Sequence, residues 1–66
     1  MNLIEGIQEE CNRLREIRTH YEKIGDAGKF GIAMIDLEIK NAEKAMAEGD
    51  AILMIQSLKG LQGISD

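Results

Sequence analysis

The dipeptide Gly-Asp occurs twice in this 66-residue chain, at Gly25-Asp26 and at Gly49-Asp50. Glycine accepts the left-handed conformation that ends a helix, and aspartate caps the free amides that begin the next one. The apolar run 51–55 could also form a buried strand, but no other segment has a strand pattern to pair with it. The two signals therefore predict three helices in a single all-α domain spanning residues 1–66.

The first segment predicts a long helix over about residues 3–24. Its apolar side chains recur every three or four positions and so share one stripe of the helix. They are Ile4, Ile7, Cys11, Leu14, Ile17, Tyr21 and Ile24. Asn2 is the expected cap, and Glu5 completes an Asn-x-x-Glu capping arrangement.

The second segment predicts a long helix over about residues 27–48, beginning at Ala27 or at Phe30, with Asp26 as its cap and two apolar surfaces. The first surface contains Phe30, Ala33, Met34 and Leu37, and the second contains Ile32, Ile35, Ile39, Ala42 and Met46. A helix with so wide an apolar arc needs neighbours on two sides. We expect the first helix on one side and a second copy of the chain on the other.

The third segment predicts a short helix over about residues 51–62, capped by Asp50. Met54, Ile55, Leu58 and Leu61 form its expected inward face, which leaves Ile52 and Leu53 in water in a monomer.

Self-association is the expected source of additional stability for so small a chain. A chain of this size buries only about 60% of its unfolded surface, and a single cysteine excludes a disulfide within it. We therefore predict a helical hairpin or bundle that forms a homo-oligomer. The expected interface residues are Ile35, Ile39, Met46, Ile52 and Leu53.

The charge balance restricts the classes of partner. Twelve acidic and eight basic residues give a net charge of −4, which argues against nucleic acid and anionic membranes. The longest apolar runs are far shorter than the roughly 20 residues of a membrane span. With no cationic and apolar leader, and with a lone thiol, we expect a cytoplasmic protein.

Neither catalysis nor metal binding is expected from the reactive side chains. Cys11 and His20 are single copies nine residues apart, which does not fit a zinc site or a thiol–imidazole pair. The sequence therefore predicts no catalytic residue, no metal ligand and no cofactor.

The glycine-rich stretch 25–31 contains Gly28-Lys29 but is not a phosphate-binding P-loop. Lys23 stands where that motif has its first glycine, and Phe30 stands where it has Ser or Thr. One interpretation is a turn whose small residues let two helices approach closely. The other is an anion site at the helix start, where Gly28 and Lys29 would act together with Arg18 and Tyr21.

Glu38 lies within the apolar arc of the second helix. A buried carboxylate needs a partner. Either an arginine of the first helix or of another chain meets Glu38 and fixes the register, or Glu38 lines a pocket and recognises a ligand donor.

Most of the chain resembles small helical accessory proteins of bacteriophages and prophages. The residues that carry the likeness are Phe30-Gly31, Met34-Ile35, Ile39, Ala42-Glu43-Lys44-Ala45, Gly49-Asp50 and Met54. The chain departs from that pattern at 25–28, where those proteins tend to carry a proline. The resemblance implies a binding protein in the host cytoplasm, directed at a host regulator or at a nucleotide second messenger of host defence.

Two functional hypotheses follow. The first is a non-enzymatic, oligomeric helical protein that binds a host protein partner. The alternative is a protein that sequesters a small anionic ligand, such as a nucleotide second messenger, at a site between chains near the turn of residues 25–31.

Overall fold

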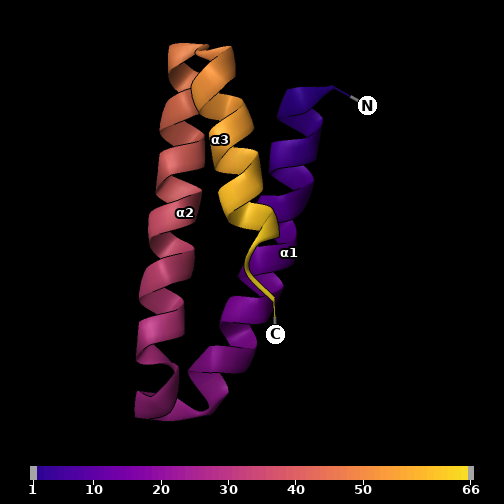
Figure 1. Cartoon of the computed structure of the whole chain (residues 1–66). Helices are drawn as coiled ribbons and strands as arrows, with labels where there is room; N and C mark the ends of the chain where they lie inside the picture. The colour runs from indigo at the N-terminus through magenta and orange to yellow at the C-terminus, as the bar shows by residue number, and fades with distance from the viewer. Residues whose placement is uncertain (1, 66) are drawn as a thin grey trace.

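A computed structural model describes residues 2–65 and contains three α-helices. They are α1 (Leu3–Lys23), α2 (Lys29–Glu48) and α3 (Ala51–Gln62), and a short 3-10 helix, η1 (Gly25–Gly28), joins the first two. Figure 1 shows α1 and α2 as an antiparallel hairpin with α3 turning back along it. Residues 2–65 contain no strand, which confirms the prediction of an all-α chain. Within that range, no helix has the length and apolar character needed to cross a membrane.

Two of the three predicted helix caps are present. The Asn2 side chain accepts a hydrogen bond from the Glu5 amide at 2.8 Å, and Asp50 accepts one from the Leu53 amide at 3.1 Å. Each carboxamide or carboxylate oxygen satisfies an amide that has no partner within its own helix. Both helices therefore begin where the sequence predicts.

The turn between α2 and α3 follows from Gly49, whose φ of 67° is left-handed. The Gly49 amide donates to the Met46 carbonyl at 3.2 Å, and the Asp50 amide donates to the Ala45 carbonyl at 3.3 Å. This pair of bonds is the Schellman motif that closes a helix. The amide of Asp50 therefore takes part in the C-cap of α2, and its carboxylate is the N-cap of α3.

Asp26 does not cap α2, contrary to the prediction. Residues Gly25–Gly28 form η1, α2 begins at Lys29, between the two starts that the sequence offers, and its N-cap Gly28 has no side-chain bond. The tighter turn satisfies the Lys29 amide with the backbone carbonyl of Asp26. The Asp26 carboxylate instead lies 3.0 Å from the Lys29 ammonium.

The core lies between all three helices. Its composition shows that part of the predicted oligomer interface is wrong. Its buried members are Ile7, Cys11, Leu14, Ile17, Ile35, Ile39, Ala42, Ala45, Met54 and Leu61. Ile35 and Ile39 are only 0% and 9% exposed, so they are not available to a second copy. The chain's own α3 supplies the second neighbour that α2 needs.

Other predicted apolar positions divide between core and surface. Met46 packs partly buried against the core. Ile52 and Leu53 are exposed as predicted, and Ile55, expected to point inward, is also exposed.

The third helix covers only part of the hairpin. With 20 and 12 residues, α2 and α3 are about 30 Å and 18 Å long, which leaves about 12 Å of α2 beyond the end of α3. Figure 1 shows this uncovered part next to η1. Within residues 2–65, η1 packs against α1 and α2 and not against α3. The bundle therefore has three helices at one end and two at the other.

Candidate functional site

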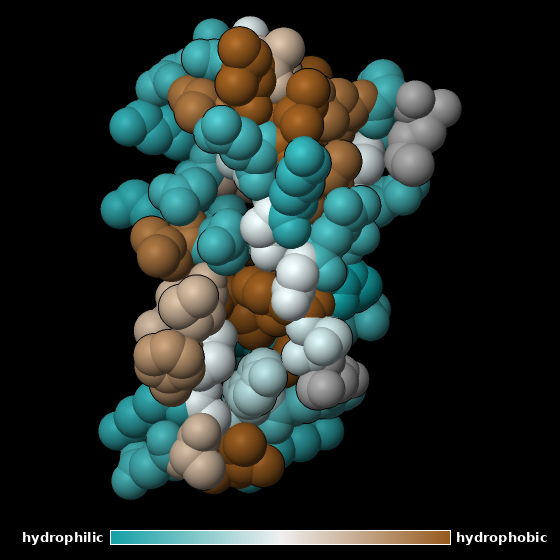
Figure 2. All heavy atoms as spheres, in the orientation of Figure 1, coloured by the Kyte–Doolittle hydropathy of each residue, from teal (hydrophilic) through white to brown (hydrophobic). Residues whose placement is uncertain are grey.

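The two-helix end exposes a group of large apolar side chains that we call the turn-end patch, made of Ile24, Phe30, Met34 and Leu37. Phe30 is 78% exposed. Phe30, Met34 and Leu37 are four and three residues apart and so share one side of α2. Figure 2 shows brown and tan atoms over this lower half of the molecule. The patch lies toward the end of the hairpin that α3 does not reach.

Tyr21 connects the α1 and α2 parts of this patch. A Cβ atom on Gly31 would lie 2.9 Å from Cε1 of the Tyr21 ring, so the ring rests directly on the α2 backbone. Four residues on the α1 side line a shallow hollow of about 210 Å³: Ile17, His20, Tyr21 and Ile24. The Tyr21 ring therefore joins α1 to α2 at the two-helix end.

Gly28 allows the two helices to meet closely at the turn. A Cβ atom there would lie 2.1 Å from the Tyr21 carbonyl oxygen, far inside van der Waals contact. Gly28 is also buried. The interpretation of the glycine-rich stretch as a close helix–helix approach is confirmed.

The residues predicted to hold an anion do not converge. Arg18 donates to the two carboxylate oxygens of Asp36 at 2.8 and 3.3 Å and lies 3.4 Å from Glu22. The hydrogen bond with Asp36 raises the pKa of Arg18. Asp36 lies seven residues beyond Lys29, about 10 Å along the helix axis, and Lys29 pairs with Asp26. Each predicted cation therefore already faces a carboxylate of its own chain.

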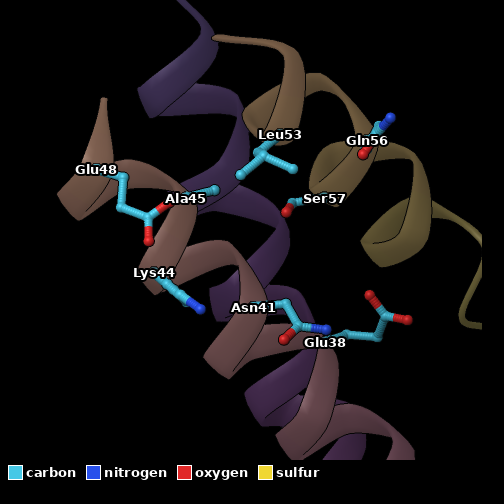
Figure 3. Close-up of a pocket in the computed structure, with 8 residues that line it drawn as sticks. All are labelled: Glu38, Asn41, Lys44, Ala45, Glu48, Leu53, Gln56 and Ser57. Carbon is cyan, nitrogen blue, oxygen red and sulfur yellow. The ribbon is translucent and has the colours of Figure 1, made fainter. Parts of the chain in front are cut away.

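Glu38 lines a polar cleft of about 320 Å³ between α2 and α3 (Figure 3). The cleft is lined by Glu38, Asn41, Lys44, Ala45, Glu48, Leu53, Gln56 and Ser57. Glu38 is partly buried and extends toward α3, where a Cβ atom on Gly60 would lie 2.5 Å from its Oε2 atom. The α1 arginine that reaches across to α2 is Arg18, and it meets Asp36 rather than Glu38. Glu38 therefore sits at a close approach of two helices.

A second exposed apolar group, the α3-start patch, consists of Ile52, Leu53 and Ile55. Ile52 and Ile55 are three residues apart and share a side of α3. Figure 2 shows brown atoms at the upper end of the molecule, where α3 begins. Glu48 and Asp50 lie close by in the sequence and make the surroundings acidic.

Arg13 is a structural residue that the sequence analysis missed. Its guanidinium donates to the carbonyl oxygens of Ile64 at 2.9 Å and Leu61 at 3.0 Å, and it also pairs with Glu10. Leu61 lies in the last turn of α3, where its carbonyl also accepts from the Ile64 amide at 3.2 Å, and Ile64 follows the helix. No local sequence pattern reveals a contact made across about 50 positions. The one available signal was the position of Arg13 at the edge of the apolar stripe of the first helix.

Cys11 is buried in the core, and burial raises the pKa of its thiol. A protonated, enclosed thiol behaves as a small apolar side chain. Within residues 2–65, no three His, Cys, Asp or Glu side chains are grouped to hold a metal ion.

Comparisons with protein-family models, with curated proteins and with solved structures find no match to this chain. Of the predicted site residues, Tyr21 and Gly28 lie together at the turn, while Arg18, Lys29 and Glu38 lie apart in separate structural contacts.

Proposed function

We propose that this chain is a non-enzymatic, self-associating helical protein that acts by binding another protein. The observation that carries the proposal is the presence of two exposed apolar patches, with Phe30 78% exposed in the turn-end patch and Ile52 69% exposed in the α3-start patch. Burying a large apolar side chain stabilises a complex by about 1.5–3 kcal/mol relative to leaving it in water. A contiguous apolar patch on a small protein commonly marks a binding surface.

Three side chains that could otherwise bind a small ligand or take part in catalysis are occupied within the fold, which supports the proposal of a protein-binding function. Arg13 binds the end of α3, Arg18 binds Asp36 on α2, and the Cys11 thiol is enclosed with a raised pKa. An anionic ligand near the turn would have to compete with Asp36 for Arg18 and with Asp26 for Lys29. We therefore favour a protein partner over a nucleotide.

The two exposed patches suit the two kinds of contact in the proposal. One patch can join copies of the chain while the other stays open to a different protein. The likeness to phage accessory proteins extends the proposal to a host protein, met in the host cytoplasm, as that partner.

Sedimentation equilibrium of the wild-type protein from micromolar to millimolar concentration tests self-association. The proposal expects the mean mass to rise above that of one chain within this range. A protein that is folded by circular dichroism and remains a monomer throughout would contradict it.

A photo-crosslinking amino acid at Ile52, introduced in cells of the source organism, tests for a protein partner. The matched control places the same amino acid at Lys40 on the exposed side of α2. We expect an adduct of defined mass from position 52 that is missing from position 40. Identical adducts at both positions, or none at either, would count against a protein partner.

A further inference from the structure

We infer that the turn-end patch is the surface through which the chain self-associates, and that its occupant is the same patch of a second copy, related by a two-fold axis. The inference rests on the self-association that the proposed function includes, and it goes further by assigning the surface and the arrangement. Closed two-fold pairing of one patch with itself is the commonest form of homodimer.

The shape of the two-helix end fits a second two-helix end. About 12 Å of α2 extends beyond α3, and Tyr21 and Gly31 form a floor between α1 and α2 there. When two such ends are laid face to face, four helices surround one apolar centre, which is a stable and common way to pack helices. The second copy takes the place that a longer α3 would have occupied.

The apolar area agrees with what a specific dimer needs. Phe30, Ile24, Leu37 and Met34 are 78%, 57%, 51% and 39% exposed. At about 150–200 Å² for a fully exposed side chain of this size, they present roughly 400 Å² of apolar surface per copy. A standard interface buries about 800 Å² per partner, of which just over half is apolar. The apolar area of the patch is therefore similar to the apolar area that one partner buries in an interface of standard size.

The distribution of charge also favours contact at this end. Residues 15–37 contain four basic and four acidic side chains, whereas the other residues that the structure describes, 2–14 and 38–65, contain four basic and seven acidic ones. Glu48 and Asp50 lie at the α2–α3 turn, at the other end of α2. In two copies joined at the η1 end, these groups are separated by more than the 36 Å length of one molecule. Their repulsion is largely screened at that distance, because the Debye length is about 8 Å in physiological salt.

The α3-start patch is a poorer self-association surface for the same reason. Glu48 and Asp50 lie within four residues of Ile52. Two copies that met there would bring these four carboxylates together, and like charges in contact oppose association. That patch is therefore left for a different partner.

The test compares dimer dissociation constants of the wild type and two double variants by sedimentation equilibrium. The turn-end variant is Phe30→Lys with Leu37→Lys, and the matched control is Ile52→Lys with Ile55→Lys. All four positions are exposed in the single chain, so the fold is expected to survive. We expect the turn-end variant to raise the dissociation constant at least about 100-fold, and the control to change it less than about 3-fold.

A cysteine cross-link provides a second measurement that does not depend on weakening the dimer. Met34→Cys and, as a control, Lys40→Cys are each placed in a Cys11→Ala background and oxidised. The inference expects a covalent dimer from position 34 and little from position 40. Equal cross-linking at the two positions would overturn it.

The outcomes separate the inference from the proposed function. If the wild type stays monomeric, both self-association and its assigned surface fail. If the wild type dimerises and the turn-end variant does so equally well, the surface assignment is wrong while self-association stands.

Discussion

The guanidinium of Arg13 donates to the carbonyl oxygen of Ile64 at 2.9 Å, although 51 positions separate the two residues. A second bond of 3.0 Å reaches the Leu61 carbonyl, so one side chain on α1 holds the end of α3. A cation at the C-terminal end of a helix is also attracted by the partial negative charge of the last carbonyls, which stabilises the contact. This contact ties the last turn of α3 and the residues that follow it to α1.

Replacing Arg13 with methionine is expected to lower the free energy of unfolding by about 1–2 kcal/mol, because carbonyl oxygens at the end of α3 lose their charged donor. Urea unfolding followed by circular dichroism measures the change. The control is Arg15→Met, since Arg15 binds only its helical neighbour Asn12 in the contacts described, at 3.0 Å. Equal losses for both variants would show that the cross-helix bonds contribute nothing.

The two aspartates that follow glycine should differ in their effect on stability. Asp50→Ala removes the cap of α3 and is expected to cost about 1 kcal/mol. Asp26→Ala removes an exposed partner of Lys29 that caps no helix, so we expect little change in the free energy of unfolding. Thermal unfolding of both variants gives the comparison, and a larger loss at Asp26 would contradict the position of η1.

Alanine at Gly28 is expected to destabilise the fold by about 3 kcal/mol or more, because its Cβ atom would meet the Tyr21 backbone. Gly25→Ala is the matched variant. Gly25 has a φ of 66° but nothing within 4 Å of a new Cβ atom, so its cost is limited to the roughly 1–2 kcal/mol of a left-handed alanine. Chemical denaturation distinguishes the two, and a smaller loss at Gly28 would contradict the close approach.

The Cys11 thiol should react slowly with a disulfide reagent in the native protein and quickly in denaturant. It is enclosed, and burial raises its pKa above the ordinary value of 9.0. Because the folded state holds this proton more tightly than the unfolded state, the thiol stabilises the fold below about pH 9 and that contribution is lost as the pH rises further. Native labelling as fast as that of the unfolded chain would show that the core is open.

Much of the fold could be predicted because its signals are local. The three-residue and four-residue spacing of apolar side chains places the helices, and Gly49-Asp50 carries both the end of one helix and the cap of the next. Gly25-Asp26 looks the same in the sequence but behaves differently. There a 3-10 turn satisfies the Lys29 amide with a backbone carbonyl, so the Asp26 side chain is not needed as a cap.

The surface that remains open could not be predicted from periodicity alone. A periodic repeat of apolar residues indicates that one face of a helix packs against another element. It does not show whether that element belongs to the same chain or to a second one. For that reason the sequence places Ile35 and Ile39 in an oligomer interface although they are buried within the chain, and it leaves out Phe30 although that side chain is exposed. The deciding quantity is the reach of α3 along α2, which depends on tertiary packing.

Charged residues were misjudged for a related reason. The sequence offers Arg18 for an anion site at the turn, but its guanidinium binds Asp36, which lies 18 positions away on another helix. Arg13 was overlooked because its acceptors lie 48 and 51 positions away. Local spacing carries no record of such pairs, and only the packing of the helices brings them together.

Phe30 is the only phenylalanine in the sequence, so growth on para-fluorophenylalanine labels the centre of the turn-end patch without a mutation. Fluorine NMR at increasing protein concentration then reports directly on whether a second copy covers this ring. The account predicts a concentration-dependent change in chemical shift and a loss of the solvent-isotope shift between water and deuterium oxide. A single resonance that keeps the full isotope shift from micromolar to millimolar protein would contradict it.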